Sequence, residues 1–231
     1  MRRIHTYIHE RTDWPHFHWR QEALGDRLAA VRHKQGRLLG RMESLGFNLR
    51  QEAVLQTLTQ DVLKSSEIEG ETLNADQVRS SIARRLGLDV AGRASPDRNV
   101  EGVVDMMMDA TTRFAEPLDA ERLFAWHAAL FPTGRSGMRR IRVGVWRDDR
   151  DGPMEVTSGP IGRERVHFQA PAPERLDREM AAFLDWFNAE TDSDPVLQAG
   201  LAHLLVCVHP SLRGRPWPRC SRHRGHGPRA L

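Results

Sequence analysis

The sequence has few of the residues that build disulfide frameworks, β-sheets or membrane spans. Its 231 residues include two cysteines, Cys207 and Cys220, so neither a disulfide framework nor a cysteine-based metal site is expected. One tyrosine stands beside abundant Ala, Leu, Arg and Glu, which favours helices. No apolar run approaches the roughly 20 residues of a membrane-spanning helix, and the first residues lack the apolar segment of a signal peptide. We therefore expect a cytoplasmic protein without a membrane partner.

The net positive charge of the chain comes from the C-terminal end of the sequence. The whole chain has a net charge of +3, but residues 209–231 contain six arginines and no acid, which leaves −3 for residues 1–208. Proteins that bind nucleic acids usually carry a basic surface on the folded domain itself. We therefore expect no specific nucleic-acid partner.

Apolar residues recur at helical spacing along most of the chain. The expected helices cover about 21–45, 49–68, 74–87, 98–114, 119–130, 173–189 and 195–208. Asn74, with Gln77 three residues later, predicts a capped helix start, and Asp194 followed by Pro195 predicts another. The last helix, "VLQAGLAHLLVCV", is apolar on nearly all sides, which is typical of a helix surrounded by others.

Residues 134–171 are rich in glycine and carry short pieces of alternating apolar and polar residues. The alternation at Ile141, Val143 and Val145 returns at Met154 and Val156. The "DDRDG" between the two pieces is typical of a turn. The pattern therefore predicts a β-hairpin with this turn at its tip.

Two features carry the chemistry. The last helix ends at His209, and a histidine held on a rigid helix end suits a general base because its pKa lies near neutrality. The alternative is a histidine that only interacts with the helix dipole. In "SSEIEGE", Ser65 and Glu69 share one face at the end of another helix, for which the alternative is a solvated acidic helix end.

Together these segments resemble the Fic (filamentation induced by cAMP) family of protein adenylyltransferases, in the branch with an N-terminal inhibitory helix. Ser65, Glu69 and Gly70 fit that family's inhibitory motif, Ser/Thr-x-x-x-Glu-Gly/Asn. "GMRRIRVGVW" followed by "PMEVTSGPIGRERVHF" resembles its flap hairpin, and "YIHERTDWPHFHW" resembles the opening of the branch. The resemblance covers most of residues 4–210.

The resemblance implies an all-α fold, with a Fic-like helical bundle, a small β-hairpin flap and an N-terminal helical extension. The extension would occupy residues 1–114, with its inhibitory helix at about 49–70, and an incomplete Fic core would occupy 115–210. An aberrant tail rich in Arg, Pro and Gly would follow at 211–231.

The resemblance also implies roles for individual residues. His209 would take the proton from a Tyr, Thr or Ser hydroxyl of a protein substrate, to which AMP passes from ATP with the help of Mg²⁺. Glu69 would inhibit by preventing productive seating of the γ-phosphate. The residues that would dock the target on the flap are Met154, Glu155, Val156, Thr157 and Ser158.

The sequence departs from the resemblance directly after Pro210. The family signature continues Phe-x-Asp/Glu-Gly-Asn-Gly-Arg-x-x-Arg, whereas no acidic residue follows Asp194 here and no Gly-x-Gly stands at the required position. The chain thus has no carboxylate after His209 that could bind Mg²⁺, and no phosphate cradle. Because both supply the electrostatic stabilisation of phosphoryl transfer, we expect the chain as written to be inactive.

We propose that a shift of the reading frame explains the departure, on a choice of codons that are rich in G and C. With GC-rich codons, the segment from Leu212 onward reads Phe-Glu-Asp-Gly-His-Gly-Arg in the neighbouring frame, and 32 arginines beside two lysines also indicate a GC-rich gene. Twelve of the last 20 residues are Arg, Gly or Pro, so we expect a poorly packed tail that leaves apolar surface of the core exposed.

A second class of function stays open beside the enzyme. The chain could be a non-catalytic regulatory protein that engages a partner through its helical extension. The sequence leaves the oligomeric state open, with a homodimer as one option.

Overall fold

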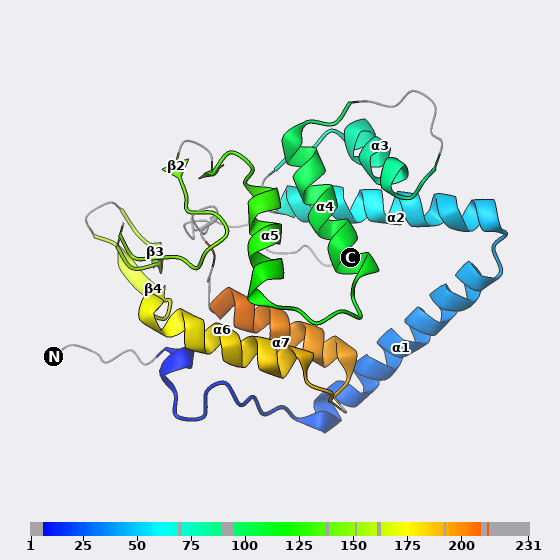
Figure 1. The fold of residues 1–231 in the computed structure, drawn as a ribbon. Coiled ribbons are helices and arrows are strands. Elements are labelled where there is room, and N and C mark those ends of the chain that lie inside the picture. The colour runs from blue at the N-terminus through cyan, green and yellow to red at the C-terminus, as the bar shows by residue number, and fades with distance from the viewer. Residues whose placement is uncertain are drawn as a thin grey trace.

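A computed structural model describes residues 7–68, 71–88, 95–136, 139–150, 152–160, 163–191, 193–208 and 212. The described elements, in chain order, are η1 (Ile8–Glu10), α1 (Gln21–Glu43), α2 (Phe47–Ile68), α3 (Ala75–Arg85), α4 (Arg98–Thr112), α5 (Ala120–Leu130), β1 (Arg135–Ser136), β2 (Arg139–Arg140), β3 (Glu155–Ser158), β4 (Arg165–Gln169), α6 (Pro173–Asn188) and α7 (Pro195–Val208). The fold is mostly helical with two small antiparallel sheets, which confirms the expected class (Figure 1). In the described ranges, no helix is long and apolar enough to cross a membrane.

The helix starts follow from local capping, as the sequence predicts. The Asn74 side chain accepts a hydrogen bond of 3.0 Å from the backbone N–H of Gln77. The Asp194 carboxylate accepts one of 2.8 Å from the N–H of Val196. Each cap satisfies a backbone donor that has no partner inside its helix, so both starts are fixed by local sequence.

A first hydrophobic core joins α2, α3 and α4. Its members are at most 1% exposed and are Leu55, Val62, Val78, Ile82, Ala83, Val100 and Val104. The apolar stripe of each helix contributes to it at the spacing expected from the sequence. We call this group the α2–α4 core.

A second hydrophobic core lies around α6 and includes residues from α7 and from the loop before α5. Its buried members are Leu118, Met180, Phe183 and Leu205. Aromatic side chains from the N-terminal segment and from α5 pack against it, among them Trp14, Phe17 and Trp126. We call this group the α6 core.

The two cores are joined where α4 crosses α5, and this crossing depends on Gly102. A Cβ atom placed on Gly102 would lie 1.8 Å from the carbonyl oxygen of Ala129, so the two backbones touch. Glycine is the residue that allows such an approach. Figure 1 shows α5 between α4 on one side and α6 and α7 on the other.

Helix α7 is less covered than its sequence predicts. Leu205 and Val208 are buried, but Leu204 and Val206 are 38% and 48% exposed. The prediction of a helix surrounded on all sides is wrong for the described chain, because α6 packs along one face of α7 while the Leu204 and Val206 side remains uncovered. The exposed apolar surface expected from the sequence is therefore present on this helix.

The hairpin forms, but between different partners from those predicted. Strand β3 pairs with β4, whereas residues 141–147 are not in a strand. The predicted turn is confirmed, since the N–H of Gly152 donates to the carbonyl of Asp149 at 2.8 Å.

Contacts with α5 explain why residues 141–147 form no strand. The Gly144 N–H lies 3.4 Å from Nδ1 of buried His127, and the Trp146 ring packs edge-on against Phe124 with centroids 4.5 Å apart. The apolar alternation in this stretch therefore serves packing against a helix.

Candidate functional site

The residues expected to dock a target lie on the β3–β4 hairpin. Strand β3 contains four of them, and the fifth, Met154, immediately precedes it, where its carbonyl accepts a hydrogen bond of 2.9 Å from the N–H of Ala170. Within the described ranges, β4 is the one strand that pairs with β3, so the other edge of β3 is not covered by a strand. An open strand edge can pair with an extended peptide.

The base of this hairpin is fixed by the N-terminal segment. The rings of Tyr7 and His9 each lie 5.6 Å from the ring of Phe168 on β4, both edge-on. His9 is 5% exposed, so this contact is part of the folded interior. At the other end of the hairpin, Ser158 Oγ and His167 Nε2 lie 2.6 Å apart across the two strands, with Ser158 half-buried and His167 exposed.

A buried arginine ties the segment before the hairpin to the segment after it. The Arg147 side chain is 1% exposed and forms an ion pair of 2.6 Å with Asp149. It also donates to the carbonyl of Pro171, two residues before α6 begins. Because a buried charge needs such partners, this pairing holds the hairpin against the start of α6.

The end of α2 carries the expected inhibitory motif. Ser65 is exposed on the last turn, while Ser66 beside it is buried and its carbonyl accepts a hydrogen bond of 2.8 Å from the N–H of Glu71. Glu69 and Gly70 lie outside the described residues. The structure thus gives the place of Ser65, and the geometry of the glutamate stays a prediction.

The end of α7 carries the expected catalytic base. Val208 is the last helical residue and is buried, and His209 lies outside the described residues. In Figure 1, α2 and α7 run in the same direction across the view, and the C-terminal end of each points toward the side of the hairpin. That Glu69 and His209 lie close together stays a prediction.

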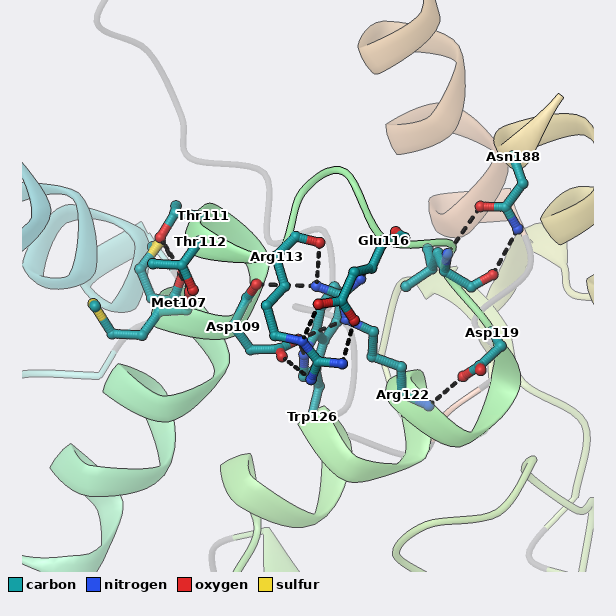
Figure 2. Close-up of polar contacts among 12 residues, drawn as sticks. Met107, Asp109, Thr111, Thr112, Arg113, Glu116, Asp119, Arg122, Trp126 and Asn188 are labelled. Carbon is teal, nitrogen blue, oxygen red and sulfur yellow. Dashed lines mark hydrogen bonds and ion pairs between the residues drawn. The ribbon is translucent and has the colours of Figure 1, made fainter. Parts of the chain in front are cut away.

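A connected group of polar side chains joins α4 to α5, and the sequence did not single it out (Figure 2). The Asp109 carboxylate accepts hydrogen bonds of 2.6 Å from Arg122 and 2.7 Å from the indole of Trp126, and it pairs with Arg113 at 2.8 Å. The i,i+4 spacing of Asp109 and Arg113 was the feature of the sequence that could have indicated an ion pair here. The partners on α5 come from a different helix, which spacing alone cannot predict.

Arg122 closes the C-terminal end of α4. Its guanidinium donates to the backbone carbonyls of Asp109 and Arg113 at 3.0 and 3.1 Å and lies 5.2 Å from the centre of the Trp126 ring. The Asp109 carbonyl also accepts a hydrogen bond of 3.0 Å from the N–H of Arg113, and the Arg113 carbonyl accepts one of 3.1 Å from the N–H of Glu116. Arg122 thus adds a cation at the negative end of the helix dipole, which is stabilising. Since α4 also packs on α2, this joint helps set where the α2 end lies relative to α6 and α7.

The environment of Asp109 favours its charged form. Partial burial would raise its pKa, but the hydrogen bonds from Arg122 and Trp126 outweigh burial and hold the pKa below its ordinary value. The carboxylate is therefore ionised whenever the protein is near neutral pH.

An open cleft of about 620 Å³ lies beside this joint. Its charged lining includes Asp105, Asp109, Arg113, Glu116 and Arg122, and both arginines pair with carboxylates of the cleft itself. Across the described ranges, no group of three or more His, Cys, Asp or Glu side chains is arranged to hold a metal ion. The cleft is accordingly part of the joint.

Comparisons with known proteins found a family model and a solved structure that match parts of the chain. The model of a domain of unknown function (DUF4172) matches residues 7–88, which hold α1, α2 and α3. Among solved structures, a Fic family protein from Desulfovibrio desulfuricans G20 is 21% identical, with a TM-score of 0.48, and the match covers 80% of this chain and 52% of that one. The chain thus spans about half the length of that protein. No curated protein matches.

Proposed function

We propose that this chain is the scaffold of a Fic-type protein adenylyltransferase whose activity is restrained by the end of α2. The observation that carries the proposal is the order of four segments along the chain. An inhibitory motif ends α2, a hairpin follows α5, α6 follows the hairpin, and α7 leads directly into His209-Pro210.

In this proposal, the hairpin presents the target. The backbone groups on the open edge of β3 pair with an extended segment of a protein substrate, which brings a Tyr, Thr or Ser hydroxyl toward the end of α7. The anchoring of β4 through Phe168 and of the preceding segment through Arg147 supports this role, because a docking strand must be held in a defined position.

His209 acts as the general base of the proposed reaction. Its imidazole accepts the proton of the target hydroxyl, the hydroxyl oxygen attacks the α-phosphorus of ATP, and pyrophosphate leaves. Glu69, at the end of α2, restrains the reaction by interfering with the γ-phosphate.

The residues of this chain do not fit the Mg²⁺ ion that the resemblance implies. Residues 195–231 contain no Asp or Glu, and the described side chains include no cluster suited to a metal. No step of the reaction is therefore assigned to a metal in this chain. This misfit supports the proposal that residues from Leu212 onward are read in a shifted frame and that the chain as written does not transfer AMP.

The experiment compares the chain with a frame-restored protein, in which Phe-Glu-Asp-Gly-His-Gly-Arg and the residues after it in the neighbouring frame replace the segment from Leu212 onward. Both are incubated with ATP labelled on the α-phosphate, and label on protein is measured. We expect label on the frame-restored protein and none on the chain as written.

The matched control is the frame-restored protein with His209→Ala, which should lose the label while keeping its circular dichroism spectrum. Absence of label on the folded frame-restored protein, or label that does not depend on His209, would refute the proposed activity. The gene sequence gives an independent check, because a neighbouring frame without the Gly-x-Gly-Arg segment rules out the shift.

A further inference from the structure

Helix α1 carries an apolar seam with the spacing of a coiled coil. Residues alternately four and three positions apart form the seam, and they are Leu24, Leu28, Val31, Gln35, Leu38 and Met42. This alternation places a and d positions on one narrow line along a helix, and one polar residue at an a position is common in such seams. The seam runs over most of the 23 residues of α1.

The seam is only partly covered in the described part of the chain, where Leu24, Leu28 and Met42 are half-buried. No residue of α1 is buried, and Leu38 and Leu39 are 61% and 62% exposed. Arg32 forms an exposed ion pair of 3.0 Å with Asp194, directly before α7, whereas Val31 and Leu38 in the middle of the seam remain exposed. A 23-residue helix gains most of its stability from packing an apolar face, so a seam that is only partly covered indicates a missing partner.

The residues that flank the seam are basic. In the heptad, the g positions are Arg27, Lys34 and Arg41, and all three are exposed. None of the three forms an ion pair with a described residue. From residue 27 to residue 42 the sequence contains five Lys or Arg residues and no acid, although residues 1–208 as a whole have a net charge of −3. The charge along this seam thus differs in sign from the body of the protein.

We propose that α1 is the docking site for an acidic amphipathic helix of another protein. The a and d side chains of that partner helix would pack into the seam, and its glutamates at e and g would pair with Arg27, Lys34 and Arg41. This interaction is independent of AMP transfer. The sequence left open a second function, in which the chain binds a partner through its helical extension. The proposal assigns that function to a defined surface and a defined kind of partner.

The charges argue against two other occupants. If a second α1 packed antiparallel, the cations at the g positions of the two helices would face one another. If it packed parallel, the g-position cations of one helix would face the e positions of the other, which include Arg32 and no acid. A membrane surface suits a wide apolar face with aromatic anchors, whereas this seam is narrow and α1 contains no aromatic residue.

The test uses a designed probe peptide with leucine at the a and d positions and glutamate at the e and g positions of three heptads. Binding to the full chain is followed by fluorescence anisotropy of the labelled peptide. We expect saturable binding, and no binding of a peptide that carries lysine at e and g. A peptide of the same composition with the heptad order scrambled should also fail to bind.

Two variants connect binding to α1. Reversing the flanking charges, with Arg27→Glu, Lys34→Glu and Arg41→Glu together, should weaken binding about tenfold or more, since three attractive pairs become repulsive. Leu38→Ser should weaken it as well, and because Leu38 is exposed the fold is retained. The matched control Arg37→Glu reverses a charge at a c position away from the seam and should leave the affinity unchanged.

Three results would overturn the docking proposal. These are failure of the acidic peptide to bind, equal binding by the scrambled peptide, and equal effects of Arg37→Glu and the seam variants. Binding of anionic phospholipid vesicles without peptide binding would assign the surface to a membrane. Self-association that Leu38→Ser abolishes would assign it to a second copy.

Discussion

Gly102 allows the backbones of α4 and α5 to touch, and this contact joins the two hydrophobic cores. A methyl group at this position would overlap the carbonyl of Ala129, and neither helix backbone can move without disturbing a core. The cost of such overpacking is typically about 1 to 3 kcal/mol, and it rises when backbone has to shift.

Replacing Gly102 with alanine is therefore expected to lower the free energy of unfolding by about 2 kcal/mol or more. Chemical denaturation monitored by circular dichroism measures the change. The matched control is Gly36→Ala on α1, where an added Cβ would meet nothing within 4 Å. There alanine should stabilise by about 0.5 to 1 kcal/mol, because it favours the helix over the unfolded chain. Equal effects of the two substitutions would contradict the close α4–α5 contact.

Asp109 makes stability depend on pH. Its pKa is lowered in the folded protein, so its contribution is present above the ordinary carboxyl pKa of about 4 and is lost as pH falls through the folded pKa. Asp109→Asn should cost about 1 to 2 kcal/mol at pH 7 and flatten the loss of stability in acid.

Unfolding curves at several pH values measure this effect, with Glu116→Gln as the control. Glu116 pairs with Arg113, but its side chain is 50% exposed, so its removal should change stability little. A loss of stability in acid that is as steep in Asp109→Asn as in the unchanged protein would show that other groups cause it.

Among the elements, the β3–β4 hairpin depends on a few anchors because two short strands are marginal by themselves. Tyr7 and His9 pack on Phe168, and the hairpin turns at Gly159, whose φ of +113° disfavours other residues. The N-terminal segment thus positions the strand that we propose for target docking.

Phe168→Ala should loosen this hairpin while leaving the helical cores intact. Amide hydrogen exchange in residues 155–169 is expected to become faster, with little change in α2–α4. Val166→Ala is the matched control, since Val166 on the same strand is 36% exposed. Exchange that is the same in both variants would mean that the aromatic contact does not hold the hairpin.

The elements also show how far sequence predicts structure. Helix starts at Asn74 and Asp194 were predictable because a cap is local. The strand that pairs with β3 could not be predicted, because the alternation at 141–145 fits a strand and a segment packed on α5 equally well. The exposure of Leu204 could not be predicted either, since it depends on which elements pack on α7.

At the scale of the whole molecule, two cores meet at one joint, and each carries a part of the candidate site. The α2–α4 core holds the helix whose end carries the proposed inhibitory motif, and the α6 core holds the helix that leads to His209. The Asp109–Arg122 joint between them could not be predicted, since its partners lie on two helices. The motifs themselves were visible because each is a short run of sequence.

The most direct test of the central claim is the effect of Glu69 on AMP transfer in the frame-restored protein. The rate of self-labelling from α-labelled ATP is measured with Glu69 and with Glu69→Gly, and Glu67→Gly serves as a control on the same helix end. The account predicts a clear rise in rate for Glu69→Gly and no rise for Glu67→Gly. A rate that is the same with and without Glu69 would contradict it.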